Sequence, residues 1–271
     1  MDKKRIPLFY WSEIKFIYRE KENYGDLLSK YIVEQISGRK VKFVQPKKQP
    51  WYRNDKKSLL AIGSIIHHAD RNSIVWGSGI IDHKQPVAKA KFEAVRGPRT
   101  RKHLLSLGYQ CPEVYGDPAI LLPKYYMPEI EKKYEIGIIP HYHDYAMAME
   151  LFKDIPEILV IDLLTLDIEE VTNKILTCKK TLSSSLHGLI VSHAYQIPSL
   201  WVEFSDKIFG NGVKYLDYLE SIDLPLYKPE KIFRKLQVEE MQFLFENNSC
   251  LPEIEKMRIL QDNLIRVWPF K

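Results

Sequence analysis

The sequence predicts an α/β fold with two Rossmann-like parts, each a parallel β-sheet with helices on both faces, and a cleft between them. Three observations support this class. Short apolar strands alternate with amphipathic helices along most of the 271 residues. Residues 121–133 (LLPKYYMPEIEKK) interrupt the alternation with two prolines and no clean periodicity. A second alternating set follows, so the chain has room for two units of ordinary domain size.

The first half is expected to contain short strands and two helices. The strands are expected at residues 8–11, 41–44, 59–62, 73–76, 92–95 and 113–114, and the helices at 26–36 and 98–107. The second helix has Pro98 in its first turn and Gly108 just beyond its last turn. This is the usual placement of proline and glycine at helix ends.

The second half repeats the alternation. Strands are expected at residues 135–140, 158–162, 180–183 and 199–203, and helices at 144–152, 167–177 and 186–196. Helices dominate the remainder, including 252–267. We therefore expect a Rossmann-like domain over residues 1–125, a second one over 133–250, and a C-terminal helix within 251–271 that packs back on the first domain.

Composition narrows the class of protein. The chain is 45% apolar and 28% charged, which is ordinary for a globular protein. It has no apolar run of about 18 residues, so no membrane-spanning helix is expected. Polar residues interrupt the apolar stretch near the N-terminus, which favours a buried strand over a secretory signal. The three cysteines are widely spaced, which predicts neither a disulfide framework nor a zinc site and favours the cytoplasm.

Positive charge is concentrated in residues 39–57. This segment holds eight lysines and arginines against a single acid, Asp55, with Trp51 and Tyr52 among them. A solvated loop is one interpretation. The other is a surface for an anionic partner, such as a membrane face, a lipid diphosphate or nucleic acid.

Certain loops are candidates for the functional site because ligands of parallel sheets bind beyond the carboxyl ends of the strands. By this rule, the candidate loops are residues 12–26, 63–68, 77–79, 96–97, 141–144, 183–187 and 204–212.

The loop at 183–187 follows a strand and begins a helix. Ser184 and Ser185 can cap this helix, whose free N–H groups and partial positive charge attract an anion. His187 would then lie beside the anion. The alternative is a plain capped helix with a packed histidine.

Two cations have similar strand-end positions. The Arg96 guanidinium could bind a phosphate or carboxylate through two parallel hydrogen bonds, or pair with a neighbouring acid. Lys207 could contact a phosphate as a point charge, or be an ordinary solvated lysine.

The sequence NYGD begins the first long helix. Gly25 permits close backbone approach there, and Asn23 and Asp26 could bind sugar hydroxyls. Gly77 and Ser78 belong to WGSG, which is only part of a dinucleotide-binding fingerprint, so NAD binding is disfavoured.

Two histidine pairs invite a metal interpretation. His67 with His68 and His141 with His143 contain suitable donors, but neither pair has the spacing of a zinc or 2-His-1-carboxylate site. We therefore expect no metal. His141 directly follows a strand, so it could contact a ligand without one.

Taken together, these segments resemble the polysaccharide pyruvyltransferase family. The resemblance rests on NYGD, WGSG, AVRGPRTRKHLLSLG, YGDPAILLP, IGIIPHY, SSSLHGLIVSHAYQIPSLWVEF and SDKIFGNGVKYLDYL, in the family order between residues 23 and 219. The best known form of the histidine motif has an arginine two residues before the histidine. Here that position is Ser185, so the arginine's contact is missing or replaced.

The resemblance implies a fold similar to the GT-B glycosyltransferases, with phosphoenolpyruvate in the cleft as co-substrate. The first domain would hold the acceptor and the second the donor. His187 and Arg96 would be catalytic. The donor-binding set implied by the matching motifs is Arg96, Ser184, Ser185, His187 and Lys207. The residues expected to bind the acceptor or line the cleft are Asn23, Gly25, Asp26, Gly77, Ser78 and His141.

The expected reaction transfers pyruvate to a sugar as a cyclic ketal. The methylene carbon of phosphoenolpyruvate is protonated, a sugar hydroxyl attacks the neighbouring carbon, phosphate leaves, and a second hydroxyl closes the ring. Histidine suits this chemistry because it exchanges protons near neutral pH. The scheme requires no metal or other cofactor.

The expected acceptor is a sugar of a cell-surface polysaccharide or of its lipid-linked precursor, met in the cytoplasm or at the anionic inner face of the membrane. Nucleic acid is not expected as a partner. One alternative is a nucleotide-sugar glycosyltransferase of the same architecture, which the donor that protects the protein thermally would identify. The other is a non-catalytic module that binds anionic polymers, which would show salt-dependent binding without turnover.

Overall fold

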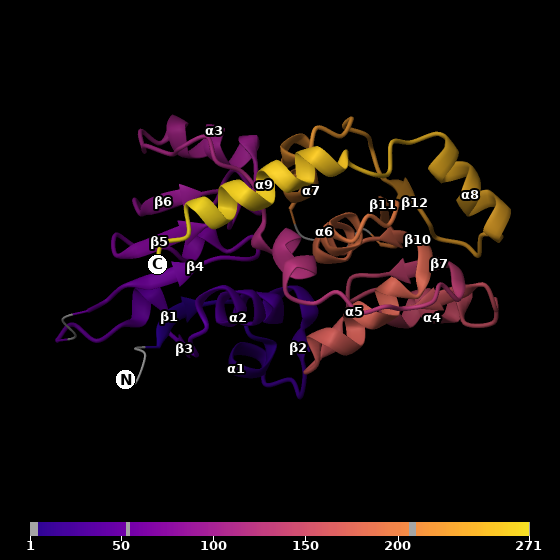
Figure 1. Ribbon diagram of the computed structural model, residues 1–271, viewed down its shortest axis with the longest axis horizontal. Helices are drawn as coiled ribbons and strands as arrows, with labels where there is room; N and C mark the ends of the chain where they lie inside the picture. The colour runs from indigo at the N-terminus through magenta and orange to yellow at the C-terminus, as the bar shows by residue number, and fades with distance from the viewer. Residues whose placement is uncertain (1–4, 53–54, 206–209, 271) are drawn as a thin grey trace.

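The computed structural model describes residues 5–52, 55–205 and 210–270 of the chain. Within these ranges, two five-stranded sheets lie towards opposite ends of an elongated molecule, with helices packed on them (Figure 1). The strands of both large sheets pair in parallel. The predicted α/β class is therefore confirmed. The predicted domain limits at residues 1–125, 133–250 and 251–271 stay a prediction.

The first sheet has the strand order β3-β1-β4-β5-β6. Its strands are β1 (Ile6–Phe9), β3 (Val41–Phe43), β4 (Ser58–Leu60), β5 (Ser73–Trp76) and β6 (Lys91–Ala94). The strand predicted at 113–114 was wrong, since only an isolated bridge joins Val95 and Tyr115. Pro112 has no N–H to donate and Gly116 turns the chain at φ +132°, so the pairing does not extend.

Helices connect these strands. They are α1 (Glu13–Ile17), α2 (Tyr24–Ser37) and α3 (Pro98–Ser106), with the 3-10 turns η1 (Pro46–Lys48), η2 (Ile66–His68) and η3 (Pro118–Lys124). Helix α2 begins where the Asn23 side chain accepts a hydrogen bond from the Gly25 N–H, and it ends at Gly38 in the left-handed conformation. It buries Leu28 and Ile32, one turn apart, against the core.

The second sheet has the order β12-β11-β10-β7-β8. Its strands are β7 (Tyr134–Ile139), β8 (Ile158–Val160), β10 (Cys178–Ser183), β11 (Ser199–Glu203) and β12 (Glu230–Lys231). The associated helices are α4 (Tyr145–Phe152), α5 (Ile168–Leu176), α6 (Leu186–Ala194), α7 (Val213–Ser221) and α8 (Val238–Glu246). The elements predicted between residues 135 and 203 agree with these to within two residues at each end.

The two halves meet in a shared apolar layer. One continuous cluster of buried side chains includes Leu8 of the first sheet and Ile139 of the second. A two-stranded antiparallel ribbon, β2 (Glu22–Asn23) with β9 (Leu164–Thr165), also joins them. Next to it, the Tyr24 hydroxyl lies 2.8 Å from the hydroxyl of Thr172. These contacts fix how the carboxyl ends of the two sheets face one another.

The last helix, α9 (Ile254–Arg266), runs from the second half back across the first (yellow in Figure 1). The Trp76 indole N–H donates to the Leu264 carbonyl at 2.9 Å, and the Trp76 ring packs 4.6 Å from that of Trp268. The Gln261 amide donates to the Ile120 carbonyl at 2.8 Å. Among the helices of the described ranges, none is long and apolar enough to cross a membrane.

Candidate functional site

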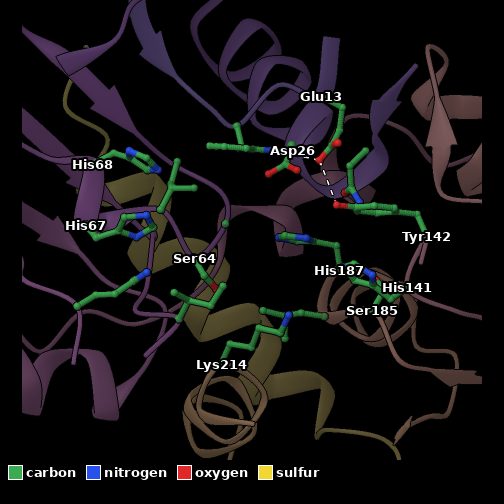
Figure 2. Close-up of a pocket in the computed structure, with 17 residues that line it drawn as sticks. Glu13, Asp26, Ser64, His67, His68, His141, Tyr142, Ser185, His187 and Lys214 are labelled. Carbon is green, nitrogen blue, oxygen red and sulfur yellow. Dashed lines mark hydrogen bonds between the residues drawn. The ribbon is translucent and has the colours of Figure 1, made fainter. Parts of the chain in front are cut away.

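A cavity of about 380 Å³ lies where the carboxyl ends of the two sheets face one another (Figure 2). Its walls come from the loops after β1, β4, β7 and β10, as the strand-end rule predicts. The lining residues are Trp11, Glu13, Asn23, Asp26, Gly63, Ser64, Ile65, His67, His68, Ile81, Gln85, His141, Tyr142, Ser185, Leu186, His187 and Lys214.

Helix α6 presents its N-terminus to this cavity. The buried Ser183 hydroxyl donates to the Ser185 carbonyl at 2.8 Å and accepts from the Ser185 N–H at 3.1 Å, which fixes the turn. Ser185 is the N-cap of α6, and its side chain makes no capping hydrogen bond. The N–H groups of the first turn therefore have no side-chain cap, which makes this end of the helix suitable for an anion.

His187 projects from the first turn of α6 into the cavity (Figure 2). Its Nε2 lies 3.6 Å from Oδ2 of Asp117, which is fully buried. Neither of these two atoms has a hydrogen-bond partner among the described residues. The Asp117 carboxylate can therefore orient the His187 ring towards the cavity.

Gly25 makes room for this histidine. A Cβ added at Gly25 would overlap the His187 ring, with Nδ1 as the nearest atom. Gly25 is thus the close-approach position expected in NYGD, and the atoms that come close belong to a site residue of the other half. Its neighbours Asn23 and Asp26 line the cavity directly.

Asp26 and Lys214 are the carboxylate and the ammonium on opposite sides of the cavity in Figure 2. Burial raises the pKa of Asp26 well above its usual value, Glu13 and Glu22 raise it further, and Lys214 opposes them. Burial lowers the pKa of Lys214 to about 8, and the charge of Arg96 adds to this shift. The cavity therefore contains groups able to change protonation at accessible pH.

His141 lines the cavity beside Ser185. Burial lowers its pKa to about 3, with Lys214 and His143 contributing, so it is a neutral imidazole at physiological pH. The backbone N–H of His141 donates a hydrogen bond to the hydroxyl of Ser184 at 2.8 Å. Ser184 is fully buried, does not line the cavity and supports the His141 loop; its predicted place in the donor site stays a prediction.

Arg96 is fully buried and lies behind the cavity wall. Its guanidinium contacts Asp217 of α7 at 3.1 Å, and it donates to the Ser64 hydroxyl at 2.7 Å and to the Ile80 carbonyl at 2.6 Å. It therefore ties the two halves together and orients Ser64, which lines the cavity. Direct contact between Arg96 and a donor stays a prediction.

Gly77 and Ser78 lie beneath the cavity. Gly77 has φ +96° and packs against Pro118, where a side chain would clash. The Ser78 hydroxyl is buried and donates to the Gly63 carbonyl at 2.8 Å. These contacts support the Gly63 loop, and the predicted role of Gly77 and Ser78 at the cleft stays a prediction. Lys207, the remaining predicted donor contact, lies outside the described residues.

Sequence reasoning singled out neither Lys214 nor Asp117, and the cavity-lining residues Trp11, Ile81 and Gln85 lie outside the loops that it named. Lys214 lies in the first turn of α7, just after the left-handed Gly212 that ends the last candidate loop. A glycine directly before a new helix is a sequence signal that could have identified Lys214 as a candidate site residue. Asp117 precedes Pro118 and caps η3, with its Oδ1 accepting from the Ala119 N–H at 3.0 Å. No local pattern indicated its approach to His187.

Comparison with known proteins agrees with this architecture. The family model described as "Polysaccharide pyruvyl transferase" matches residues 23–206, which is well over half of the chain. A protein of Acanthamoeba polyphaga mimivirus named "Uncharacterized protein L143" is 34% identical over 215 residues, covering 76% of this chain and 74% of the relative. The matched region contains Asp117 and His187, and the carboxyl-end loops that form most of the cavity. The chain belongs to the polysaccharide pyruvyl transferase family.

Proposed function

We propose that this protein transfers the pyruvyl group of phosphoenolpyruvate to two hydroxyls of a sugar, forming a cyclic ketal and releasing phosphate. The observation that carries the proposal is the arrangement of His187 at an uncapped helix N-terminus, with Asp117 behind it and Lys214 on the same cavity. Anion binding and proton transfer are thus available in one cavity.

The donor would lie against the N-terminus of α6. The first-turn N–H groups and the Lys214 ammonium favour a phosphate or carboxylate there. Arg96 adds positive charge just behind Ser64. Among the described residues that line the cavity, Lys214 is the lysine or arginine side chain that reaches it.

His187 would give a proton to the methylene carbon of the donor, which becomes a methyl group. The adjacent carbon is then electrophilic, and a sugar hydroxyl adds to it. Loss of phosphate and addition of a second hydroxyl complete the ketal. Of the two hydroxyl protons released, one replaces the proton given by His187 and the other leaves with phosphate. Asp117 lies behind the His187 ring and orients it for this proton transfer.

The test is donor-dependent phosphate release. The protein is incubated with phosphoenolpyruvate and a panel of methyl glycosides and lipid-linked oligosaccharides, and the product is examined by NMR for a ketal methyl group. The expected result is phosphate release that requires both substrates. If nucleotide sugars are consumed and phosphoenolpyruvate is not, the glycosyltransferase alternative replaces this proposal.

We also propose that the amino edge of the first sheet docks on an anionic membrane, where lipid-linked acceptors would be met. Arg5, Lys40 and Lys57 immediately precede the adjacent strands β1, β3 and β4, so the parallel register brings these exposed cations to one edge. The nearby Trp51 and Tyr52 side chains are 87% and 71% exposed. Basic residues beside exposed aromatic rings suit an anionic lipid interface.

This surface is tested by sedimentation with vesicles. The protein should bind phosphatidylglycerol vesicles at low salt and phosphatidylcholine vesicles weakly, and Lys40→Glu with Lys57→Glu should abolish the difference. Equal binding of the double variant and the wild type to anionic vesicles would exclude this docking surface.

A further inference from the structure

The cavity has a second wall, opposite His187, that the reaction scheme does not use. It is formed by loops of the first half and includes Trp11, His67, His68 and Gln85. In Figure 2, His67 and His68 face the cavity from the side opposite His187. Their rings pack 4.1 Å apart, and the Trp11 ring lies 6.0 Å from that of His68. We call these four residues the aromatic wall.

The aromatic wall is electrically neutral near physiological pH. Burial lowers the pKa of His68 to about 4, with His67 and Lys47 contributing. Burial and Lys47 also lower the pKa of His67. The Lys47 ammonium does not line the cavity, since it donates to the His67 carbonyl at 2.7 Å. Each neutral imidazole offers one N–H donor and one nitrogen acceptor.

Two polar atoms of the aromatic wall are buried and have no hydrogen-bond partner within the part of the chain that the structure describes. They are Nδ1 of His67 and Oε1 of Gln85. Buried polar atoms are normally hydrogen-bonded, because leaving them unpaired is costly. Both side chains line the cavity, so a small rotation of each would bring these atoms to the hydroxyls of a ligand. His67 Nδ1 could donate or accept a hydrogen bond, and Gln85 Oε1 could accept one.

Trp11 is held rigidly in this wall. Its indole N–H donates to Oε1 of Glu13 at 3.1 Å, and its ring packs 4.7 Å from that of Phe16. Glu13 is itself buried, and its Oε1 also accepts from the Tyr142 hydroxyl at 3.4 Å. The indole is therefore fixed in orientation before any ligand arrives, which lowers the entropic cost of binding against it.

We infer that the aromatic wall binds the pyranose ring of an uncharged acceptor sugar, with the ring's C–H face on Trp11 and its hydroxyls on His67 and Gln85. This inference rests on the proposed function, since it names the acceptor for the same cavity. Aromatic rings with a few placed polar groups are the usual lining of a site for such a ligand. The buried Glu13 carboxylate lies at the cavity beside Trp11 and disfavours a uronic acid or a sugar phosphate there.

The experiment compares acceptor and donor kinetics across matched variants. Trp11→Ala should raise the KM for a neutral methyl glycoside by about tenfold or more, while the KM for phosphoenolpyruvate changes less than about twofold. Trp11→Phe should restore most of the acceptor affinity. Phe243→Ala removes an exposed aromatic ring outside the cavity and should change neither constant.

A second variant covers the possibility that Trp11→Ala unfolds. Gln85→Ala removes an atom without a partner, so thermal unfolding should be unchanged and the acceptor KM should rise several-fold. Methyl glucuronide should be a poor acceptor for the wild type. Unchanged acceptor KM values in Trp11→Ala and Gln85→Ala, or equal use of the glucuronide, would overturn the inference.

Direct binding separates this inference from the proposed function. Saturation-transfer NMR with neutral methyl glycosides should show binding by the wild type, lost in Trp11→Ala, even without phosphoenolpyruvate. If no glycoside supports phosphate release but this binding pattern is found, the proposed reaction fails and the aromatic wall stands as a sugar site. If phosphate is released and the binding pattern is absent, only the aromatic wall is refuted.

Discussion

Replacing Arg96 with alanine should destabilise the whole protein. From sequence alone, Arg96→Ala is expected to weaken donor binding while leaving the fold intact. The structure predicts otherwise, because Arg96 and Asp217 are each fully buried and their side chains form an ion pair between the two halves. The same guanidinium also donates to Ser64 and to the Ile80 carbonyl.

The expected loss of stability follows from the contacts that Asp217 keeps when the Arg96 side chain is removed. Asp217 keeps two hydrogen bonds, from the Thr100 N–H at 2.9 Å and the Thr100 hydroxyl at 2.7 Å, but loses its counter-charge. Breaking a buried ion pair by removing one partner costs about 3–5 kcal/mol. The two remaining hydrogen bonds place the expected loss near about 3 kcal/mol, a large share of the roughly 5–15 kcal/mol typical of a folded protein.

The assay is urea unfolding followed by tryptophan fluorescence, with a double-mutant cycle. Asp217→Asn removes the carboxylate charge while nearly keeping the shape of the side chain. The loss of unfolding free energy in the double variant with Arg96→Ala should therefore be smaller, by at least about 1 kcal/mol, than the sum of the losses in the two single variants. Arg99→Ala is the matched control. Its pair with Glu220 also joins α3 to α7, at 2.7 Å, but both side chains are about 30% exposed. Its loss should cost no more than about 1 kcal/mol.

Two results would refute this reasoning. The first is a loss of stability in Arg96→Ala no greater than that in Arg99→Ala. The second is strict additivity between Arg96→Ala and Asp217→Asn. Either would mean that the buried pair does not stabilise the junction of the two halves, and that Arg96 is free for the donor-binding role predicted from the sequence.

Three further predictions concern catalysis. Gly25→Ala should lower kcat about 100-fold because the added methyl group displaces the His187 ring. Lys30→Ala, which changes an exposed side chain on the same helix, should leave kcat unchanged. Equal kcat values for the two variants in steady-state assays would contradict this prediction. His187→Ala and His187→Gln should both abolish transfer, because glutamine hydrogen-bonds but exchanges no proton near pH 7; a Gln variant with near wild-type turnover would leave His187 as a ligand only. Phosphoenolpyruvate affinity, measured by calorimetry, should fall about tenfold between pH 7 and pH 9, because the pKa of Lys214 is lowered to about 8 by burial and then by Arg96, so the free protein loses this cation as pH rises. Lys214→Met should bind weakly with a flatter profile, and a profile that persists there would assign the titration to another group.

The sequence by itself determined the elements and the edge where the site lies. Alternating apolar strands and amphipathic helices are local patterns, and the parallel sheets that they predict place every strand's carboxyl end on one side. That rule alone gathered Asn23, Asp26, His141, Ser185 and His187, and the structure places all five in the cavity wall. Their separation along the chain did not matter, because parallel pairing of the strands brings the loops at their carboxyl ends together in space.

Only the tertiary structure decided which partner each strand-end side chain meets. Arg96 and Asp217 are separated by 121 residues, and no local pattern links them, yet their side chains pair at the junction of the two halves. Ser184 and His187 lie in the same loop but meet different partners. The Ser184 hydroxyl is buried and accepts a hydrogen bond from the His141 backbone, while the His187 imidazole reaches both the cavity and Asp117. The low pKa of Lys214 also required the fold, because burial causes it, and burial depends on residues brought together from the whole chain.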